Sequence, residues 1–424
     1  MEKTVIKQTK EDKSVKSKTA LIMPHFGGEK HVRHKLEHRF AVKDEAFLRC
    51  MGHMLGPSII PGNKVKTLQN GDQIFPAMVG SIERAEKTIS FETFVYWAGD
   101  IGQKFCNALI ERSKAGVKVH IILDWWGTQR IDEKYIDSMK TAGIEIEKYH
   151  PLRWYNFNRM NNRTHRKLLI VDGKIGFIGG VGIADEWQGN AESKDHWRDS
   201  HYQVEGPVVA QMQAAFNDNW INTHSKVLLG NNYFPELKPR VKGIMAQVIR
   251  SARYSSENVR LMNLLAISSA VKNIRLQAAY FVPDELTIKT LVAAQKRGVN
   301  IEIIVPGPYM DSKTVQRASR SLWGSLLDAG VKIYEYQPTM YHCKVLIVDN
   351  LGVSVGSTNF DDRSFRLNDE ANLNIYDADF AAEQIKFFEE DKSKSRLVTR
   401  ADYRKMSKIR KMLDKLAGIF QRQM

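Results

Sequence analysis

The sequence has few cysteines and no long apolar run. Cys50, Cys106 and Cys343 are its three cysteines, and their spacing matches neither a disulfide framework nor a metal site. They are expected to be reduced thiols in a cytosolic setting. No apolar run reaches the roughly 18–20 residues of a membrane-spanning helix, and the N-terminus lacks the apolar core of a secretory signal. We therefore expect a chain that neither spans a membrane nor is exported by that route.

Acidic residues are in short supply, with 48 Asp and Glu against 63 Lys and Arg, so the net charge is +15. Otherwise the composition, 43% hydrophobic and 26% charged, is that of an ordinary folded chain. A length of 424 residues is long for one core and favours two domains or two fused halves. No carboxylate-rich cluster of the kind that holds magnesium stands out, so no metal or other cofactor is expected.

The excess positive charge lies at the two ends. Residues 1–40 hold 10 Lys and Arg against 5 Asp and Glu, and residues 391–424 hold 11 against 3. Such ends suit a polyanionic surface, either anionic lipid or nucleic acid, although a solvated tail explains the N-terminal one equally well. Residues 403–420 carry apolar side chains at spacings of three and four between lysines, which predicts an amphipathic basic helix for an anionic interface or for docking on the body.

The chain contains an internal repeat. "ERSKAGVKVHIILD" (111–124) resembles "AQKRGVNIEIIVP" (294–306), and "THRKLLIVDG" (164–173) resembles "YHCKVLIVDN" (341–350). The offset drifts between 177 and 187 residues, which indicates two diverged copies with loop insertions. Within each copy short apolar runs alternate with helical stretches, which predicts an α/β sandwich with a largely parallel or mixed sheet. The expected domains are an extension (1–67), two repeats (68–230 and 231–390) and a basic tail (391–424).

The repeated segment has the pattern His-x-Lys-x4-Asp, in which the four x residues form an apolar run. "KLLIVDG" and "KVLIVDN" are apolar on both pleat faces, so each should be a central strand. Residues two apart on a strand share a face, so His165 and Lys167 should point the same way, as should His342 and Lys344. Asp172 and Asp349 each lie an odd number of residues from the histidine. We interpret these two motif carboxylates as positioning or ion-pair residues.

Two halves related by a pseudo-two-fold would bring both His/Lys pairs into one pocket. Lysine binds phosphate as a point charge, and imidazole can act as a nucleophile or a proton donor. One histidine would attack phosphorus, the other would protonate the leaving oxygen, and the lysines would hold the charge on the remaining oxygens. Two copies of the motif inside a recognisable repeat are strong support, because a single copy can arise by chance.

These motifs resemble the phospholipase D superfamily, and within it the bacterial cardiolipin synthases without transmembrane helices. The resemblance covers roughly residues 68–390 and rests on "HRKLLIVDGKIGFIGG" and "HCKVLIVDNLGVSVGSTNFDDRSFRLNDEANL". "GSTN" and "RSFRLNDE" in the second stretch resemble the synthase branch in particular. The fold implied is two α/β/α sandwich halves with the active site between them.

The resemblance also implies roles for individual residues. His165 would be the nucleophile and His342 the general acid and then the base, while Glu370 (or Asp369) would support His165 and Asp199 would support His342. The family pattern further makes Asn359 a hydrogen-bond donor to phosphate, with Ser357 nearby. One departure is Gly182, which stands where the family has Asn after the first motif, so that water or a neighbour such as Asn161 or Asn162 would replace that donor.

The expected activity is phosphatidyl transfer between phospholipids through a phosphohistidine, giving cardiolipin from phosphatidylglycerol and a second phospholipid. A phospholipase D-type hydrolase or nuclease is the alternative, and a non-catalytic membrane- or nucleic-acid-binding protein is a weaker one. Phospholipids and an anionic membrane surface are the expected partners, rather than nucleic acid. The expected location is peripheral, on the cytoplasmic face of the cell membrane.

Overall fold

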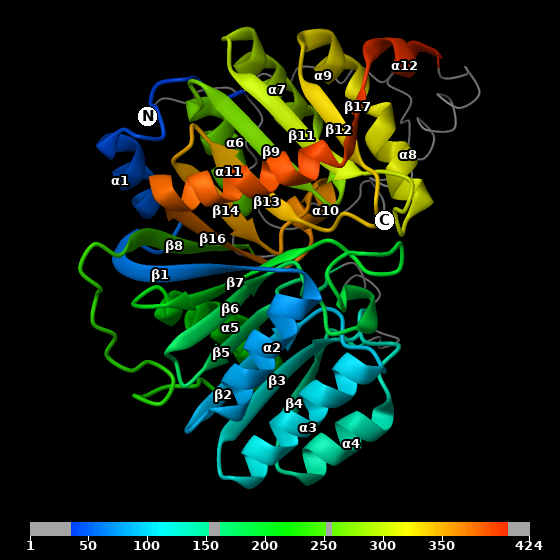
Figure 1. Cartoon of the computed structure of the whole chain (residues 1–424). Coiled ribbons are helices and arrows are strands. Elements are labelled where there is room, and N and C mark those ends of the chain that lie inside the picture. Colours follow the sequence, from blue (N-terminus) through cyan, green and yellow to red (C-terminus); the bar gives the residue numbers. More distant parts are fainter. Residues whose placement is uncertain (1–34, 152–161, 252–256, 406–424) are drawn as a thin grey trace, which may run out of the picture. The chain divides into compact units, whose positions relative to one another are not determined.

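The computed structural model describes residues 35–151, 162–251 and 257–405, and the strands of the two repeats form one continuous sheet (Figure 1). Strands β1 (Ile60–Gln69) and β8 (Ile244–Ser251) pair antiparallel where the halves meet, with Ile60 opposite Ala246. From this pair outwards the first half runs β1-β7-β6-β5-β2-β3-β4, and the second runs β8-β16-β14-β13-β9-β11-β12, with β17 added at its edge. The strand order therefore has the pseudo-two-fold relation that the repeat predicts.

The remaining strands are short. In the first half they are β2 (Thr88–Thr93), β3 (Lys118–Asp124), β4 (Glu145–Tyr149), β5 (Leu168–Val171), β6 (Ile175–Gly179) and β7 (Ser200–Glu205). In the second half they are β9 (Asn273–Ala278), β11 (Asn300–Pro306), β12 (Lys332–Tyr336), β13 (Lys344–Val348), β14 (Gly352–Gly356), β16 (Glu370–Tyr376) and β17 (Ser395–Val398), and β10 (Phe281–Val282) pairs with β15 (Phe360–Asp361) separately. The sheet is mixed, because β2, β3 and β4 are parallel whereas β5, β6 and β7 are antiparallel.

Helices cover both faces of the sheet. Helices α2 (Asn70–Glu83), α3 (Asp100–Lys114) and α4 (Glu133–Thr141) pack on one face of the first half, and α5 (Val209–His224) packs on the other. The second half has α6 (Asn258–Ser269), α7 (Glu285–Lys296), α8 (Lys313–Ser321), α9 (Trp323–Ala329), α10 (Asp362–Arg366) and α11 (Ala378–Ser393). Side chains of α5 and α11 enter one shared apolar core that extends across both halves. This α/β/α layering agrees with the predicted fold class.

The two motif strands lie inside the sheet, as their apolar sequences predict. Strand β5 lies between β2 and β6, and β13 lies between β9 and β14. All residues of both strands are buried. Alternate side chains of β5 enter different cores, with Leu168 on the α5 side and Leu169 on the α2 and α3 side. A strand covered on both faces needs apolar residues at every position, which explains why these runs show no alternation.

The folded body is longer at both ends than the charge distribution indicates. Residues 60–69, which straddle the end of the predicted extension, form the central strand β1. Helix α1 (Glu45–Met54) packs Phe47 and Met51 into the core of the second half. At the other end, β17 pairs with β12 and is followed by α12 (Arg400–Lys405). Charge excess alone does not separate a tail from a solvated strand that is stabilised by its neighbours, so the predicted limits at 67 and 391 do not coincide with those of the folded body.

Candidate active site

The first motif is held by the second half of the chain. The backbone N–H of His165 donates to the carbonyl of Asp369 (2.9 Å), and the N–H of Asp369 donates to the carbonyl of Arg163 (2.9 Å). Next in the chain is Glu370, fully buried at the start of β16, whose Oε1 lies 3.0 Å from Nδ1 of His165. The imidazole of one half is thus fixed by a carboxylate of the other.

The second motif repeats this arrangement in the opposite direction. The N–H of His342 donates to the carbonyl of Arg198 (2.8 Å), and the N–H of Arg198 donates to the carbonyl of Met340 (2.9 Å). Oδ2 of the fully buried Asp199 lies 2.7 Å from Nδ1 of His342. In each pair Nδ1 faces the carboxylate, so Nε2 is the nitrogen that remains for reaction. The structure brings together the two His–carboxylate pairs that the resemblance implies.

Two buried lysines lie beside the two histidines. Lys167 Nζ donates to the carbonyl of His165 (2.8 Å) and Lys344 Nζ to the carbonyl of His342 (2.7 Å). Lys344 Nζ also lies 3.2 Å from Nε2 of His342. The charges of both lysines lower the pKa of both histidines, which places all four groups within electrostatic reach of one another. Such a group can bind a phosphodiester anion.

Burial favours the neutral form of both histidines. It lowers the pKa of His165 to about 4 and that of His342 to about 3, and it lowers the pKa of Lys167 to about 7. A nucleophilic histidine must be neutral to attack phosphorus, because only then does its nitrogen have a free lone pair. A bound phosphodiester would bring a negative charge beside His342 and the lysines and would raise their pKa values. Substrate binding can therefore favour the protonated form of His342, which takes its proton from solvent and can then act as the general acid.

The carboxylates stay charged although they are buried. Burial alone would raise the pKa of Glu370, but His165, Lys167 and the Ser357 hydroxyl together hold it below its usual value. Ser357 Oγ donates to Glu370 Oε2 at 2.5 Å. The sequence places Ser357 near phosphate beside Asn359, whereas the structure engages its hydroxyl with the carboxylate. Its contact is set by the neighbouring strand β16, which no local pattern reveals.

Asn359 and Asn162 are candidates for contacting phosphate. Asn359 is 6% exposed, and its Oδ1 has no hydrogen-bond partner among the described residues. Asn162 is 1% exposed, and within the same described part of the chain neither atom of its amide has a partner. Asn161 lies outside the described residues. Buried amides are normally paired, so the open Nδ2 of Asn162 is available as a donor, whereas the open atom of Asn359 is an acceptor oxygen. The phosphate-donor role of Asn359 stays a prediction.

The motif aspartates act on the backbone at the far end of the strands. The Asp172 carboxylate accepts the N–H groups of Glu86 (3.0 Å), Lys87 (2.7 Å) and Thr88 (2.9 Å), which fixes the start of β2 beside β5. Asp349 does the same for residues 271–273 before β9. We infer that both are positioning residues, because their carboxylates face backbone at the strand end opposite the histidines.

Replacing Asp172 by Ala should therefore reduce stability more than chemistry. Three N–H groups lose a charged acceptor, so we expect the free energy of unfolding to fall by about 3 kcal/mol. Asp172→Asn should lose less, because one amide oxygen can keep part of the contact. Urea unfolding measures the loss, and kcat is then compared at a temperature where each variant is folded. Full stability combined with a lost kcat would place Asp172 in the chemistry instead.

Two buried arginines were not found from the sequence. Arg166 donates from Nε to the carbonyl of Glu370 (3.3 Å), and Arg198 donates from Nη1 to the carbonyl of Asp199 (2.7 Å). Each arginine thus holds the backbone of a histidine's partner carboxylate. Arg166 occupies the x of the first His-x-Lys, so its position in the motif could have marked it as a residue of the site. The contact of Arg198 is shown only by the fold.

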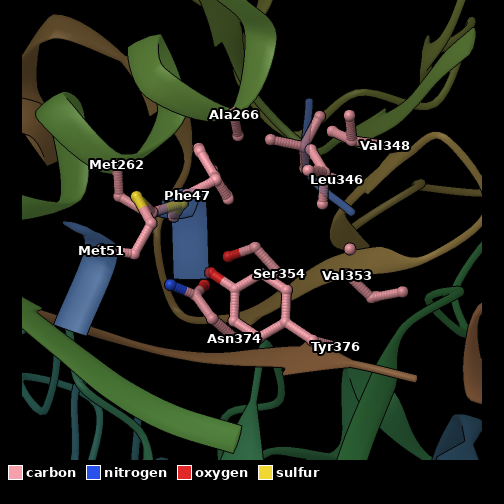
Figure 2. Close-up of a pocket in the computed structure, with 12 residues that line it drawn as sticks. Phe47, Met51, Met262, Ala266, Leu346, Val348, Val353, Ser354, Asn374 and Tyr376 are labelled. Atoms are coloured by element: carbon pink, nitrogen blue, oxygen red, sulfur yellow. The ribbon is translucent and has the colours of Figure 1, made fainter. Parts of the chain in front are cut away.

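A cavity elsewhere in the second half is separate from this site. It lies between α1, α6 and the sheet, and Phe47, Met51, Met262 and Leu346 line it together with Ser354 and Asn374 (Figure 2). Neither histidine lines this cavity. Over the described ranges no group of three or more His, Cys, Asp or Glu side chains could hold a metal ion. In the same ranges no helix has the length and apolarity to cross a membrane.

Comparisons with known proteins agree with this geometry. Residues 78–220 and 264–392 match the family described as "Cardiolipin synthase, PLD-like domain". Cardiolipin synthase A of Pseudomonas fluorescens is 32% identical over 376 residues, which cover 88% of this chain and 77% of that protein. Cardiolipin synthase 1 of Bacillus anthracis is 35% identical over 77% of this chain, and the match spans 66% of that protein's length.

Among solved structures, phosphatidylserine synthase of Haemophilus influenzae superposes with a TM-score of 0.68 over 88% of this chain and 97% of that one. At 14% sequence identity this is a likeness of fold. The matched family segments include both motifs and both partner carboxylates. The chain therefore belongs to the cardiolipin synthase family of phospholipase D-like phosphatidyltransferases, which act on phospholipids.

Proposed function

We propose that this protein makes cardiolipin by transferring a phosphatidyl group from one phospholipid to the glycerol hydroxyl of phosphatidylglycerol. The observation that carries the proposal is the pair of crossed contacts, His165 with Glu370 and His342 with Asp199, together with two buried lysines. Each half alone contains an imidazole without its carboxylate. A reaction with two chemically different histidines at one phosphorus fits this arrangement.

In the first step Nε2 of His165 attacks phosphorus, and the bond from phosphorus to the leaving alcohol oxygen breaks. His342 gives its proton to that oxygen, and the donor's headgroup alcohol departs. In the second step the acceptor hydroxyl loses its proton to His342 and attacks phosphorus, which releases His165. The lysines compensate the charge on the non-bridging oxygens throughout. When both donor and acceptor are phosphatidylglycerol, the products are cardiolipin and glycerol.

The test is a lipid assay with the purified protein. Phosphatidylglycerol labelled in its acyl chains is supplied with and without phosphatidylethanolamine, and the lipid products and released alcohols are separated and counted. We expect cardiolipin and one alcohol per cardiolipin, with a chelator leaving the rate unchanged when lipid packing is unchanged. Phosphatidic acid as the sole product would make the protein a hydrolase, and cleavage of oligonucleotides instead of lipid would make it a nuclease.

The protein is further proposed to work at an anionic membrane surface, peripherally and on its cytoplasmic face. Its basic C-terminal segment supports this, since roughly 1 kcal/mol of attraction is expected per basic residue near such a surface. The predicted amphipathic helix at 403–420 lies outside the described residues beyond Lys405. Before that point, Tyr403 contacts the end of α8, with its hydroxyl 3.4 Å from the carbonyl of Ser321.

Truncation after Lys405 should weaken binding to anionic vesicles, and the loss should shrink as salt rises. This end point keeps the Tyr403 contact, so the described body is not altered. Activity on substrate in detergent micelles should fall much less. Vesicle co-sedimentation at several salt concentrations measures the effect. Unchanged vesicle binding by the folded truncated chain would assign the membrane contact to another surface.

A further inference from the structure

We propose that Trp187 is a positioning residue for His342, acting through Asp199, and that Gly180 and Gly182 make room for it. The inference rests on the proposed function in one respect, namely that His342 is the acid and base of the reaction. Trp187 ends the short 3-10 turn Asp185–Trp187 and is 2% exposed.

One indole contacts both members of the His342 pair. Trp187 Nε1 donates to Asp199 Oδ2 at 3.0 Å, and the same oxygen lies 2.7 Å from Nδ1 of His342. The other oxygen, Oδ1, accepts the N–H of Ser200 at 2.8 Å. The Trp187 ring also packs edge-on against His342, with 5.3 Å between centroids and 78° between planes. The indole therefore fixes both the carboxylate and the ring that the carboxylate orients.

In the other half, a different residue donates to the carboxylate that orients the histidine. Strands β6 and β14 are equivalent in the repeat and end at Gly179 and Gly356, so Gly180 corresponds to Ser357. Ser357 supplies the side-chain donor to Glu370, the carboxylate that holds His165. Glycine at 180 has no side-chain donor to offer Asp199. Trp187, seven residues later, provides it from a separate turn.

The two glycines are what this arrangement requires. A Cβ at 180 would lie 2.5 Å from Asp199 Oδ1, so a serine there would displace the carboxylate. A Cβ at 182 would lie 2.7 Å from Val95 Cβ and 3.2 Å from Cζ3 of Trp187. The space in which the family's Asn would stand is thus filled by Val95 and the indole ring. Gly182 accordingly reflects a repacked wall around His342, in which an added Asn has no room.

The turn that carries Trp187 is itself anchored. The Asp185 carboxylate accepts the N–H groups of Asp100 (3.0 Å) and Ile101 (2.9 Å) at the start of α3. An indole N–H can only donate, so it stabilises Asp199 as the anion and opposes its rotation. On the other side, the Ser357 hydroxyl accepts the N–H of Ala371 at 3.1 Å, which leaves its own hydrogen for Glu370. Each carboxylate thus has its own neutral donor, a strand hydroxyl for Glu370 and an anchored indole for Asp199.

Trp187→Phe tests this, because it keeps an aromatic ring and removes the N–H. The protein is labelled with 15N-histidine, and the ring-nitrogen signals of His342 are assigned as those that are absent from His342→Gln. These signals report the tautomer of His342 without any turnover. We expect them to change in Trp187→Phe and to be unchanged in Trp323→Phe. That control also loses an indole bond, from Trp323 Nε1 to the Ser319 hydroxyl (3.1 Å). Unchanged His342 signals in Trp187→Phe would overturn the proposal even if the lipid activity were never found.

A second experiment compares the rate of Trp187→Phe with two donors whose leaving groups differ in their need for a proton. With phosphatidylglycerol as donor, Trp187→Phe should lower kcat about tenfold at nearly constant KM, because proton delivery by His342 is impaired. With phosphatidyl-p-nitrophenol the burst of nitrophenolate should change less than about twofold, because that group leaves without a proton. Ser357→Ala should instead slow the burst. Equal losses with both donors in Trp187→Phe would contradict an action through His342.

Gly182→Asn gives an independent outcome. If Gly182 merely lacked a phosphate donor, the asparagine would restore that donor and activity would rise. Displacement of Trp187 instead predicts a loss, with altered His342 signals like those of Trp187→Phe. Higher activity with unchanged His342 signals would overturn the role assigned to Gly182 and Trp187.

Discussion

His165→Ala and His342→Ala should each lower turnover by at least about 10⁴-fold, and the double variant should be no slower than either single one. Residues that act as a unit are not additive, since removing either one already stops the shared reaction. Initial rates of cardiolipin formation measure the effect, and thermal unfolding shows whether each variant is folded. Near-normal activity in either single variant would exclude a pocket shared by the two halves.

The same variants separate the two histidines by role. With phosphatidyl-p-nitrophenol the leaving group needs no proton, so His342→Ala should retain slow formation of a phosphoenzyme. His165→Ala should form none, because the nucleophile is missing. Acid quench followed by detection of labelled protein distinguishes them. Label on the protein in His165→Ala, absent in His342→Ala, would reverse the assignment.

Glu370→Gln and Asp199→Asn should each lower kcat by about 10²- to 10⁴-fold while the protein stays folded. An amide can present N–H to Nδ1 of the imidazole, which favours the tautomer whose proton is on the wrong nitrogen. The variants also lose the negative charge that stabilises an imidazolium. The loss should appear mainly in kcat, since both carboxylates are fully buried against the histidines.

Glu92→Gln is the matched control for these two variants. Glu92 is also fully buried, and it accepts hydrogen bonds from the Thr164 hydroxyl and from Asn219 Nδ2 (2.7 Å) beside the first motif. Burial raises its pKa to about 7. Both donors reach its Oε1, which a glutamine keeps, so an amide should replace it with little change in kcat. If all three variants lost activity equally, buried charge in general rather than histidine orientation would explain the loss.

The chemistry and the layered fold could be predicted from the sequence, because both depend on local or repeated patterns. The four-residue apolar runs LLIV and VLIV must be covered on both faces, which predicts β5 and β13 as central strands, and the duplicated His-x-Lys before them predicts one pocket with two imidazoles. Strand β1 was not predicted as a central strand. Its sequence, IPGNKVKTLQ, is only partly apolar, and its place is set by pairing with β7 and β8.

The carboxylates that contact the histidines and the donors that contact those carboxylates differ in how far the sequence reveals them. Glu370 and Asp199 could be named from a family resemblance, but the hydroxyl of Ser357 on one carboxylate and the indole of Trp187 on the other could not. Side chains at 357 and 370, or at 187 and 199, meet because neighbouring strands and an anchored turn bring them together. The amino-acid types determined that a phosphate could be attacked here; long-range packing decided which neutral donors hold each carboxylate, and so how each imidazole is oriented.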